Sequence, residues 1–163
     1  MLDDKQTILT AIIDAIPDYV YAKDANGRFT VANQGVTVLM GAKSPADVIG
    51  HTVMDFFPED LAKQYHADDM TIIKTGQALI NREERTVDHT GKTGWALTTK
   101  VPIRDAQGGV IGLVGISRDI SDLKQTQQML EQTRADLENR VIERTANLQR
   151  SQEFMRATLD TLI

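Results

Sequence analysis

Few side chains in this sequence are suited to catalysis or to metal binding. The three histidines, His51, His66 and His89, are far apart, and none has a partner at metal-ligand spacing such as that of H-E-x-x-H. The acidic pairs Asp68–Asp69 and Glu83–Glu84 are adjacent in sequence, so the two carboxylates of each pair point in different directions. We interpret both pairs as solvated charge and predict no catalytic residue and no metal site.

The sequence contains no cysteine. Disulfides, thiolate zinc sites, cysteine-ligated iron–sulfur clusters and a thiol nucleophile are therefore excluded. A P-loop and the G-x-S-x-G motif of hydrolases are also missing from the sequence. We therefore expect no enzymatic activity within this chain.

Composition indicates a soluble globular protein. The 163 residues provide one domain of ordinary size and an extension, with 41% hydrophobic and 25% charged residues. The net charge of -5 and the lack of clustered Lys and Arg argue against nucleic-acid binding. No apolar run approaches the roughly 18–20 residues that span a bilayer, and the N-terminus lacks the regions of a signal peptide. We expect a cytoplasmic location without direct membrane insertion.

Hydrophobic periodicity and turn residues predict the secondary structure. Ile8, Ile12, Ile13 and Ile16 lie at helical spacing, and Pro17 ends that helix. Alternation and β-branched content predict strands over residues 19–23, 28–32, 81–89, 95–104 and 110–117. Three further helices are predicted between the second and third strands, over residues 33–40, 44–50 and 58–74.

This order predicts an α+β fold. The strands can all pair antiparallel through short turns, and the helices between them have apolar stripes that must pack on one face of the sheet. We expect a five-stranded antiparallel sheet with helices on one face over residues 18–121, after an amphipathic helix over residues 1–17. The last strand is nearly all apolar or Gly, which favours a central strand buried on both faces.

Four stretches of the sequence resemble a PAS domain. They are Y-V-Y-A-K-D-A-N-G-R-F at 19–29, K-T-G-Q at 74–77, W-A-L-T-T-K-V-P-I-R-D at 95–105 and G-I-S-R-D-I-S at 115–121. The last contains the D-[IV]-[ST] motif with which PAS domains end, here Asp119, Ile120 and Ser121. The resemblance is greatest to PAS domains that precede bacterial sensor histidine kinases and diguanylate cyclases. The G-G-D-E-F motif of the cyclases and the phosphoacceptor H-box of the kinases are themselves absent.

The resemblance implies a ligand pocket between the inner face of the sheet and the middle helices. Alternation along the last two strands and the first selects the candidates Tyr21, Trp95, Leu97, Thr99, Leu113, Gly115 and Ser117. Thr99 and Ser117 offer hydrogen bonds in apolar surroundings, and Gly115 leaves space. A packed core without any ligand is an equal alternative, and a slip of one residue would invert the assigned face.

The resemblance leaves the cofactor unidentified. Haem-binding relatives place their axial ligand on the middle helix, where His66 lies, but no haem motif supports that role and a surface histidine is the alternative. A flavin bound without a covalent link is also conceivable, whereas cysteinyl-flavin photochemistry is excluded because the sequence has no cysteine.

After residue 121 the sequence predicts one long coiled-coil helix over residues 122–153. A spacing of four then three residues gives an apolar seam that contains Leu123, Leu130, Leu137, Val141 and Leu148. Such a helix has no core of its own, which favours a parallel homodimer; a helix that folds back onto its own domain is the alternative. Residues 154–163 resemble the start of a second PAS unit.

Two functions are consistent with this organisation. In the first, a small ligand or partner changes the last strand, and Asp119, Ile120 and Ser121 couple that change to the dimeric helix and an output domain. In the second, the chain only dimerises and spaces its neighbours without binding a ligand.

Overall fold

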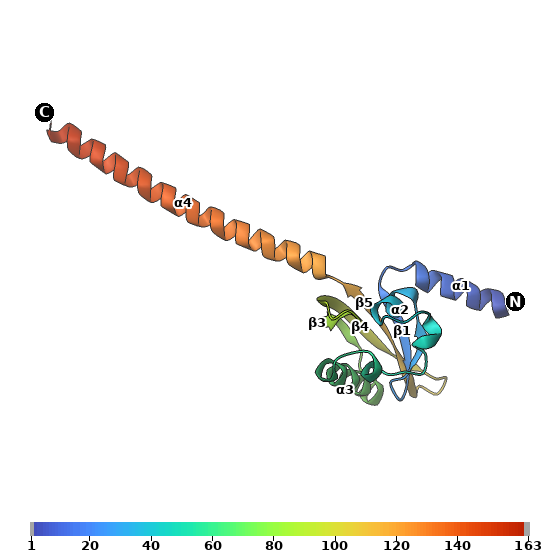
Figure 1. The fold of residues 1–163 in the computed structure, drawn as a ribbon. Helices are drawn as coiled ribbons and strands as arrows, with labels where there is room; N and C mark the ends of the chain where they lie inside the picture. The colour runs from blue at the N-terminus through green and yellow to red at the C-terminus, as the bar shows by residue number, and fades with distance from the viewer. Residues whose placement is uncertain (1, 162–163) are drawn as a thin grey trace. The chain divides into compact units, whose positions relative to one another are not determined.

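A five-stranded antiparallel sheet with the strand order β2-β1-β5-β4-β3 forms the centre of the fold (Figure 1). The computed structural model describes residues 2–161. The strands are β1 (Tyr19–Asp24), β2 (Phe29–Ala32), β3 (Leu79–Val87), β4 (Thr93–Arg104) and β5 (Val110–Asp119). The predicted antiparallel α+β fold is confirmed, and all five predicted strands are present.

The two D-A-x-G sequences form the tight turns that fix the strand pairing. Asp24 Oδ1 accepts hydrogen bonds from the backbone N–H groups two and four residues later, at 2.8 and 2.9 Å. Asp105 Oδ1 makes the same two bonds, at 3.0 and 2.8 Å. Gly27 and Gly108 close the turns with φ of 75° and 86°, a conformation that other residues rarely adopt.

The helices before and after β2 are α1 (Leu2–Ala15), α2 (Gln34–Leu39) and α3 (Glu59–Thr75). The helix predicted over residues 44–50 is wrong, because only a single 3₁₀ turn, Pro45–Asp47, forms there. The chain leaves the helical path at Gly50, whose N–H donates to the carbonyl of Phe29 at 2.8 Å. The carbonyl of His51 then accepts a hydrogen bond from the N–H of Phe29 at 2.9 Å. Gly50 and His51 therefore pair with the beginning of β2 and do not continue a helix.

Asn33 connects three elements from the centre of the domain, where its side chain is fully buried. Its Oδ1 accepts from the N–H groups of Val20 and Val36, each at 3.1 Å. Its Nδ2 donates to the carbonyls of Ile13 at 3.0 Å and Asp18 at 2.8 Å. One amide thereby caps α2, as predicted, and also fixes the end of α1 and the beginning of β1.

One buried ion cluster holds α3 against the sheet. The buried residues of α3 are Ala62, Tyr65, Asp69 and Ile72, at helical spacing. Asp69 is the charged member: its Oδ2 lies 2.5 Å from Lys23 Nζ on β1, and its Oδ1 lies 2.7 Å from Lys100 Nζ on β4. The helix and two strands are therefore joined by charges that have left water and depend on one another.

Within residues 2–121, one face of β5 is buried and the other is partly exposed. On β5, Gly112, Leu113, Gly115 and Ser117 are buried, whereas Ile111 and Ile116 are 50% and 40% exposed. The prediction that this strand is buried on both faces is therefore wrong. Because the sequence of β5 is apolar at nearly every position, it does not show which residues lie on the buried face and which on the exposed face.

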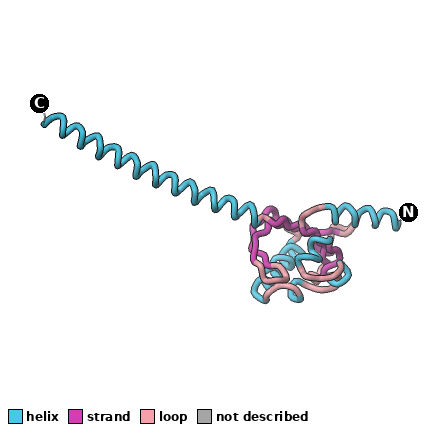
Figure 2. Tube along the Cα trace, turned by 45° about the horizontal axis from the view of Figure 1, so that its top comes forward, coloured by secondary structure: helices cyan, strands magenta, loops and turns pink. Residues whose placement is uncertain are grey.

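Helix α4 (Ser121–Thr161) is a single helix without interruption (Figures 1 and 2). Contacts divide the chain into two units, one up to Ser121 and one from Asp122. The helix continues through the predicted boundary at residue 154, and the last two residues of the predicted second PAS unit lie outside the described part of the chain. None of the helices in the described residues is long and apolar enough to cross a membrane.

Replacing Asp69 should be far more damaging than replacing its neighbour. Asp69→Asn leaves two buried lysines without an anion, and we expect it to lower the free energy of unfolding by about 3–5 kcal/mol. Asp68→Asn removes a carboxylate that is paired with Arg82 nearer the surface, and should cost about 1 kcal/mol or less. Urea unfolding followed by the fluorescence of the single tryptophan measures both losses. Equal losses would contradict the assigned role of Asp69.

Candidate functional site

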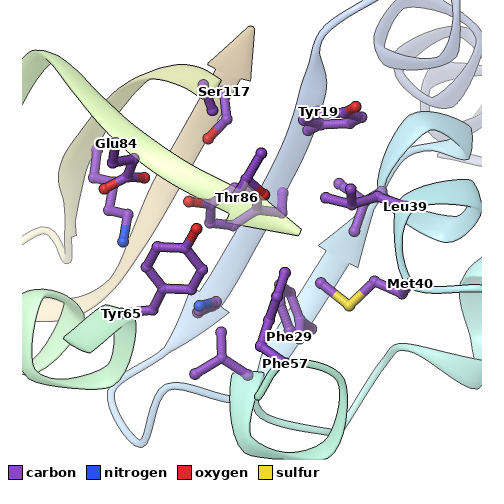
Figure 3. A pocket seen from close by; sticks show the side chains of 15 residues that line it. Tyr19, Phe29, Leu39, Met40, Phe57, Tyr65, Glu84, Thr86 and Ser117 are labelled. Atoms are coloured by element: carbon purple, nitrogen blue, oxygen red, sulfur yellow. The ribbon is translucent and has the colours of Figure 1, made fainter. Parts of the chain in front are cut away.

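A small cavity lies between the inner face of the sheet and helices α2 and α3. Its volume is about 50 Å³. One part of its wall is apolar and is formed by Phe29, Val36, Leu39, Met40, Val53 and Phe57. The other part carries polar groups, with Tyr21, Lys23, Tyr65, Glu84, Thr86, Lys100 and Ser117. Figure 3 shows Glu84, Ser117 and the Tyr65 hydroxyl towards one side, and Leu39 and Met40 towards the other.

Lys23 and Lys100 bring positive charge to the cavity wall. Both are 2% exposed, and both donate to Asp69 behind them. Lys23 Nζ also lies 4.5 Å from the ring centre of Phe29, and Lys100 Nζ lies 5.5 Å from that of Tyr65. Burial lowers the pKa of Lys23. Burial also opposes the charge of Lys100, but Tyr21 and Asp69 outweigh it and raise the pKa of that ammonium group.

Glu84 brings negative charge to the same wall. Its Oε2 accepts from Arg82 Nη2 at 3.0 Å, and its side chain is 8% exposed. Arg82 also binds Asp68 of α3, through Nη1 at 3.2 Å and through Nη2. Strand β3 is thereby held to α3 by an ion pair, with the Glu84 carboxylate directed to the cavity side of the sheet (Figure 3).

Three hydroxyl groups complete the polar wall. Ser117 Oγ accepts from Thr98 Oγ1 on the neighbouring strand at 3.0 Å. Tyr65 donates its phenol proton to the carbonyl of Arg85 at 2.5 Å. Burial raises the pKa of Tyr21, and separately that of Tyr65, to about 12, so both phenols are neutral donors at ordinary pH.

The strand that provides Ser117 leads directly into α4. Ile120, which is buried, donates its N–H to the carbonyl of Trp95 at 2.9 Å, and Trp95 N–H donates to Ser121 Oγ at 3.0 Å. Asp119 Oδ1 accepts from Ser121 N–H at 2.8 Å. The beginning of β4 therefore holds the three residues that precede or begin the helix.

A second contact joins the two ends of the domain. Arg118 donates from Nε and Nη2 to the carboxylate of Asp18, at 2.9 Å each. Asp18 lies between α1 and β1, and Arg118 lies near the end of β5. Asp18 raises the pKa of Arg118, which stays charged in any case.

The sequence profile of a family described as "PAS fold" matches residues 13–125. The chain belongs to the PAS-fold family. The match covers more than half of the chain and extends from the end of α1 across the whole sheet to the beginning of α4.

Related proteins that contain PAS domains are longer than this chain. A diguanylate cyclase of Vibrio cholerae is 27% identical over 134 residues, which cover 81% of this chain and 41% of the cyclase. The methanogenesis regulatory histidine kinase FilI of Methanothrix harundinacea is 29% identical over 118 residues, which cover 70% of this chain and 12% of the kinase. The chain thus spans less than half the length of either relative.

Solved structures also resemble the chain. The VqmA dimer of Vibrio cholerae, a DNA-binding receptor, is 28% identical with a TM-score of 0.63, over 72% of this chain and 52% of VqmA. VqmA has also been solved bound to DPO, with a TM-score of 0.62 to this chain.

Four of the predicted pocket residues of the PAS domain lie on the inner side of the sheet. Tyr21 and Ser117 line the cavity. Gly115 lies beneath Tyr21, because a Cβ atom at this position would overlap the tyrosine ring. Leu113 is fully buried but is not part of the cavity wall.

Trp95, Leu97 and Thr99 do not line the cavity. The side chains of β4 that face it alternate with these three: Ala96, Thr98 and Lys100 are buried, and Ala96 and Lys100 line the cavity. The face assigned from the sequence is therefore displaced by one residue. The assignment on β4 was based on the larger apolar residues. The inner face of β4 instead contains Lys100, whose charge is neutralised by Asp69 of α3, a helix that comes earlier in the sequence.

Sequence reasoning missed Lys23, Asp69, Glu84 and Lys100. The interpretation of both acidic pairs as solvated charge is wrong for one member of each, since Asp69 is fully buried and Glu84 is 9% exposed. A signal was present, because Asp69 falls on the apolar stripe of α3 between Tyr65 and Ile72. A charge at such a position requires a partner of opposite sign.

Neither haem nor flavin fits this cavity. Ligand sites of that kind have volumes of about 300–1,000 Å³, far above the 50 Å³ found here. His66 is not among the residues that line the cavity; it lies against Gly27 in the first hairpin turn. Its Nδ1 is buried without a hydrogen-bond partner among the described residues. In residues 2–161 no three His, Asp or Glu side chains gather as metal ligands.

The neutral state of Tyr21 should make stability fall at high pH. A tyrosine with a pKa near 10 when unfolded and about 12 when folded stabilises the fold below pH 10, and that contribution disappears as the pH rises to 12. Tyr21→Phe should remove on the order of 2 kcal/mol of this pH dependence. Tyr19→Phe, at a less buried position, should remove less. Urea unfolding at a series of pH values measures both slopes, and a Tyr21→Phe slope parallel to that of the wild type would contradict the expectation.

Proposed function

We propose that this chain is the sensory and signal-transducing part of a longer protein. A small molecule binds in the inner cavity of the PAS domain, the change reaches the end of β5, and two α4 helices carry it to an output domain. In this proposal residues 18–121 sense, residues 122–153 transmit, and Asp119, Ile120 and Ser121 couple the two.

The continuity of β5 carries the proposal. The strand contributes Ser117 to the cavity wall, and α4 begins four residues later at Ser121. Trp95 of β4 binds the backbone of Ile120 and the side chain of Ser121. A ligand that moves the beginning of β4 therefore acts directly on Ile120 and Ser121, and one that moves Ser117 acts four residues before α4 begins. Only residues 118–120 lie between the cavity wall at Ser117 and the beginning of α4.

The exposed apolar residues of α4 support a dimer. Those of the predicted seam are each more than half exposed in the single chain: Leu123, Leu130, Leu137, Val141 and Leu148. Their spacing of three and four residues makes a narrow stripe that a second copy, parallel and in register, covers completely. Polar seam positions such as Gln127 and Arg134 weaken that packing. A weak seam suits a helix pair that changes between two arrangements.

The output domain in this proposal is a diguanylate cyclase or a histidine kinase, because relatives with those names contain the matching segment as a minor part of their length. The related receptor VqmA binds DNA. For this chain we propose no nucleic-acid contact, since its net charge is -5. We also propose a cytoplasmic location without direct membrane insertion.

A second candidate is a dimeric spacer that binds nothing. The small volume of the cavity favours this spacer, because 50 Å³ is enough for only about three to five buried water molecules. The charged wall favours sensing instead, since an inert core would be more stable with apolar residues in those positions.

Native mass spectrometry of protein purified without added ligand separates these two candidates. We expect a small additional mass that disappears on mild activation, and a higher melting temperature for the loaded form than for the stripped form. A bare mass, together with no thermal shift across a library of small metabolites, would establish the spacer.

Disulfide cross-linking tests the dimer, because the chain has no cysteine of its own. A parallel, in-register seam brings the two copies of Leu137 together, so Leu137→Cys should form linked dimers at least about tenfold faster than Asn139→Cys on the other side of the helix. Equal rates for the two variants, or a monomer in sedimentation at micromolar concentration, would refute the proposed seam.

A further inference from the structure

The charges around the cavity are balanced before any ligand arrives. Lys23 and Lys100 share Asp69, and Arg82 binds both Glu84 and Asp68. The network therefore contains three cations and three anions. Of the charged members, two lysines and one glutamate line the cavity itself. The remaining titratable groups that face it are the phenols Tyr19, Tyr21 and Tyr65, which are neutral at ordinary pH.

This balance selects against a charged ligand. A full charge brought into the cavity would add an unpaired ion among side chains that are mostly buried, and such an ion is costly unless a counter-charge is at hand. The positive side of the wall is committed to Asp69 and the negative side to Arg82. An added anion would be repelled by Glu84, and an added cation would be repelled by the two lysines.

The wall nevertheless has unused hydrogen-bonding capacity of both kinds. An ammonium group has three donors, and Lys100 directs one of them to Asp69. A carboxylate accepts several hydrogen bonds, and the bond to Glu84 comes from Arg82. A neutral dipole can therefore bind both sides at once, with its acceptor towards the lysines and its donor towards Glu84.

The cavity also limits the size of the ligand. A buried water needs about 10–15 Å³ of such volume, so 50 Å³ holds roughly three to five groups of that size. The apolar part of the wall, which includes Phe29 and Met40, accommodates a short hydrocarbon end.

We propose that the cavity selects a small, uncharged, dipolar molecule with a hydrogen-bond acceptor, a hydrogen-bond donor and a short apolar end, such as a short-chain amide. The acceptor binds Lys100 and Lys23, the donor binds Glu84, and the apolar end lies against Phe29 and Met40. This ligand class rests on the proposed function, since it requires that the cavity binds a ligand at all.

Four molecules of nearly equal size and shape test the proposal in the wild-type protein. Propionamide has a donor and an acceptor without charge, butanone has an acceptor only, propionate is an anion, and propionamidine is a cation. Each is titrated by NMR, with the methyl resonance of Met40 as the reporter of the cavity. We expect propionamide to bind at least about tenfold more tightly than each of the other three.

The outcomes separate this inference from the function on which it rests. Tightest binding of propionate or of propionamidine would overturn the proposed ligand class while ligand sensing stands. Equal binding of butanone and propionamide would show that the charged wall recognises nothing, which also overturns it. If none of the four shifts Met40 but native mass spectrometry finds another bound molecule, the class is wrong and the sensing function stands. If neither experiment finds binding, both proposals fail.

Replacing Glu84 by an uncharged residue of the same shape provides a second test. Glu84→Gln removes the negative charge from the cavity wall, so the affinity ratio of propionate to propionamide should rise by at least about tenfold. Glu83→Gln removes the same charge from the neighbouring exposed position and should leave the ratio unchanged. Circular dichroism checks that both variants are folded. An unchanged ratio in a folded Glu84→Gln protein would contradict the role of Glu84, and the wild-type comparison decides the ligand class if that variant does not fold.

Discussion

The carboxylate of Asp69 between Lys23 and Lys100 is the interaction on which the domain depends. It is the point at which α3, β1 and β4 meet, and none of its three side chains is more than 2% exposed. Two lysines on the inner face of a sheet would be incompatible with a folded core without an anion on the covering helix. The charge cluster therefore fixes the position of α3 along the sheet, because a shift of the helix would separate Asp69 from both lysines.

The same cluster explains why a cavity remains above the sheet. Tyr21, Lys23 and Lys100 carry polar atoms to the inner face, and apolar side chains from α2 and α3 cannot close tightly over them without leaving donors unsatisfied. The rings of Phe29 and Tyr65 lie beside the two ammonium groups and cover part of their charge. The result is a small space with a polar and an apolar wall. An interior of this kind is less stable than a fully apolar one, which is a reason to connect it with binding.

The sequence was sufficient for the fold and insufficient for the cavity. Strands, turns and the long helix follow from local patterns: Asp24 and Asp105 each form their own turn, and the period of apolar residues changes from two to seven after Ser121. The face of β4 does not follow from a local pattern, because the position of Lys100 depends on Asp69, 31 residues earlier in the chain. The failure at Trp95, Leu97 and Thr99 has this origin. The available signal was the presence of opposite charges at inward-facing positions of separate elements, namely Lys23, Asp69 and Lys100. Only when the three are considered together do they predict a buried ion cluster.

The end of β5 is held by contacts on two sides. Trp95 holds Ile120 and Ser121 from the β4 side, while Asp18 holds Arg118 from the end of α1. Asn33 in turn binds the carbonyl of Asp18, so the covering helix α2 is connected to the same place. The contacts on both sides of this strand end are thus connected to elements that line the cavity, α2 and β4. In the proposed function, these two contacts are the route by which a change in the cavity would reach the beginning of α4, and the polar positions Gln127 and Arg134 would weaken the proposed seam.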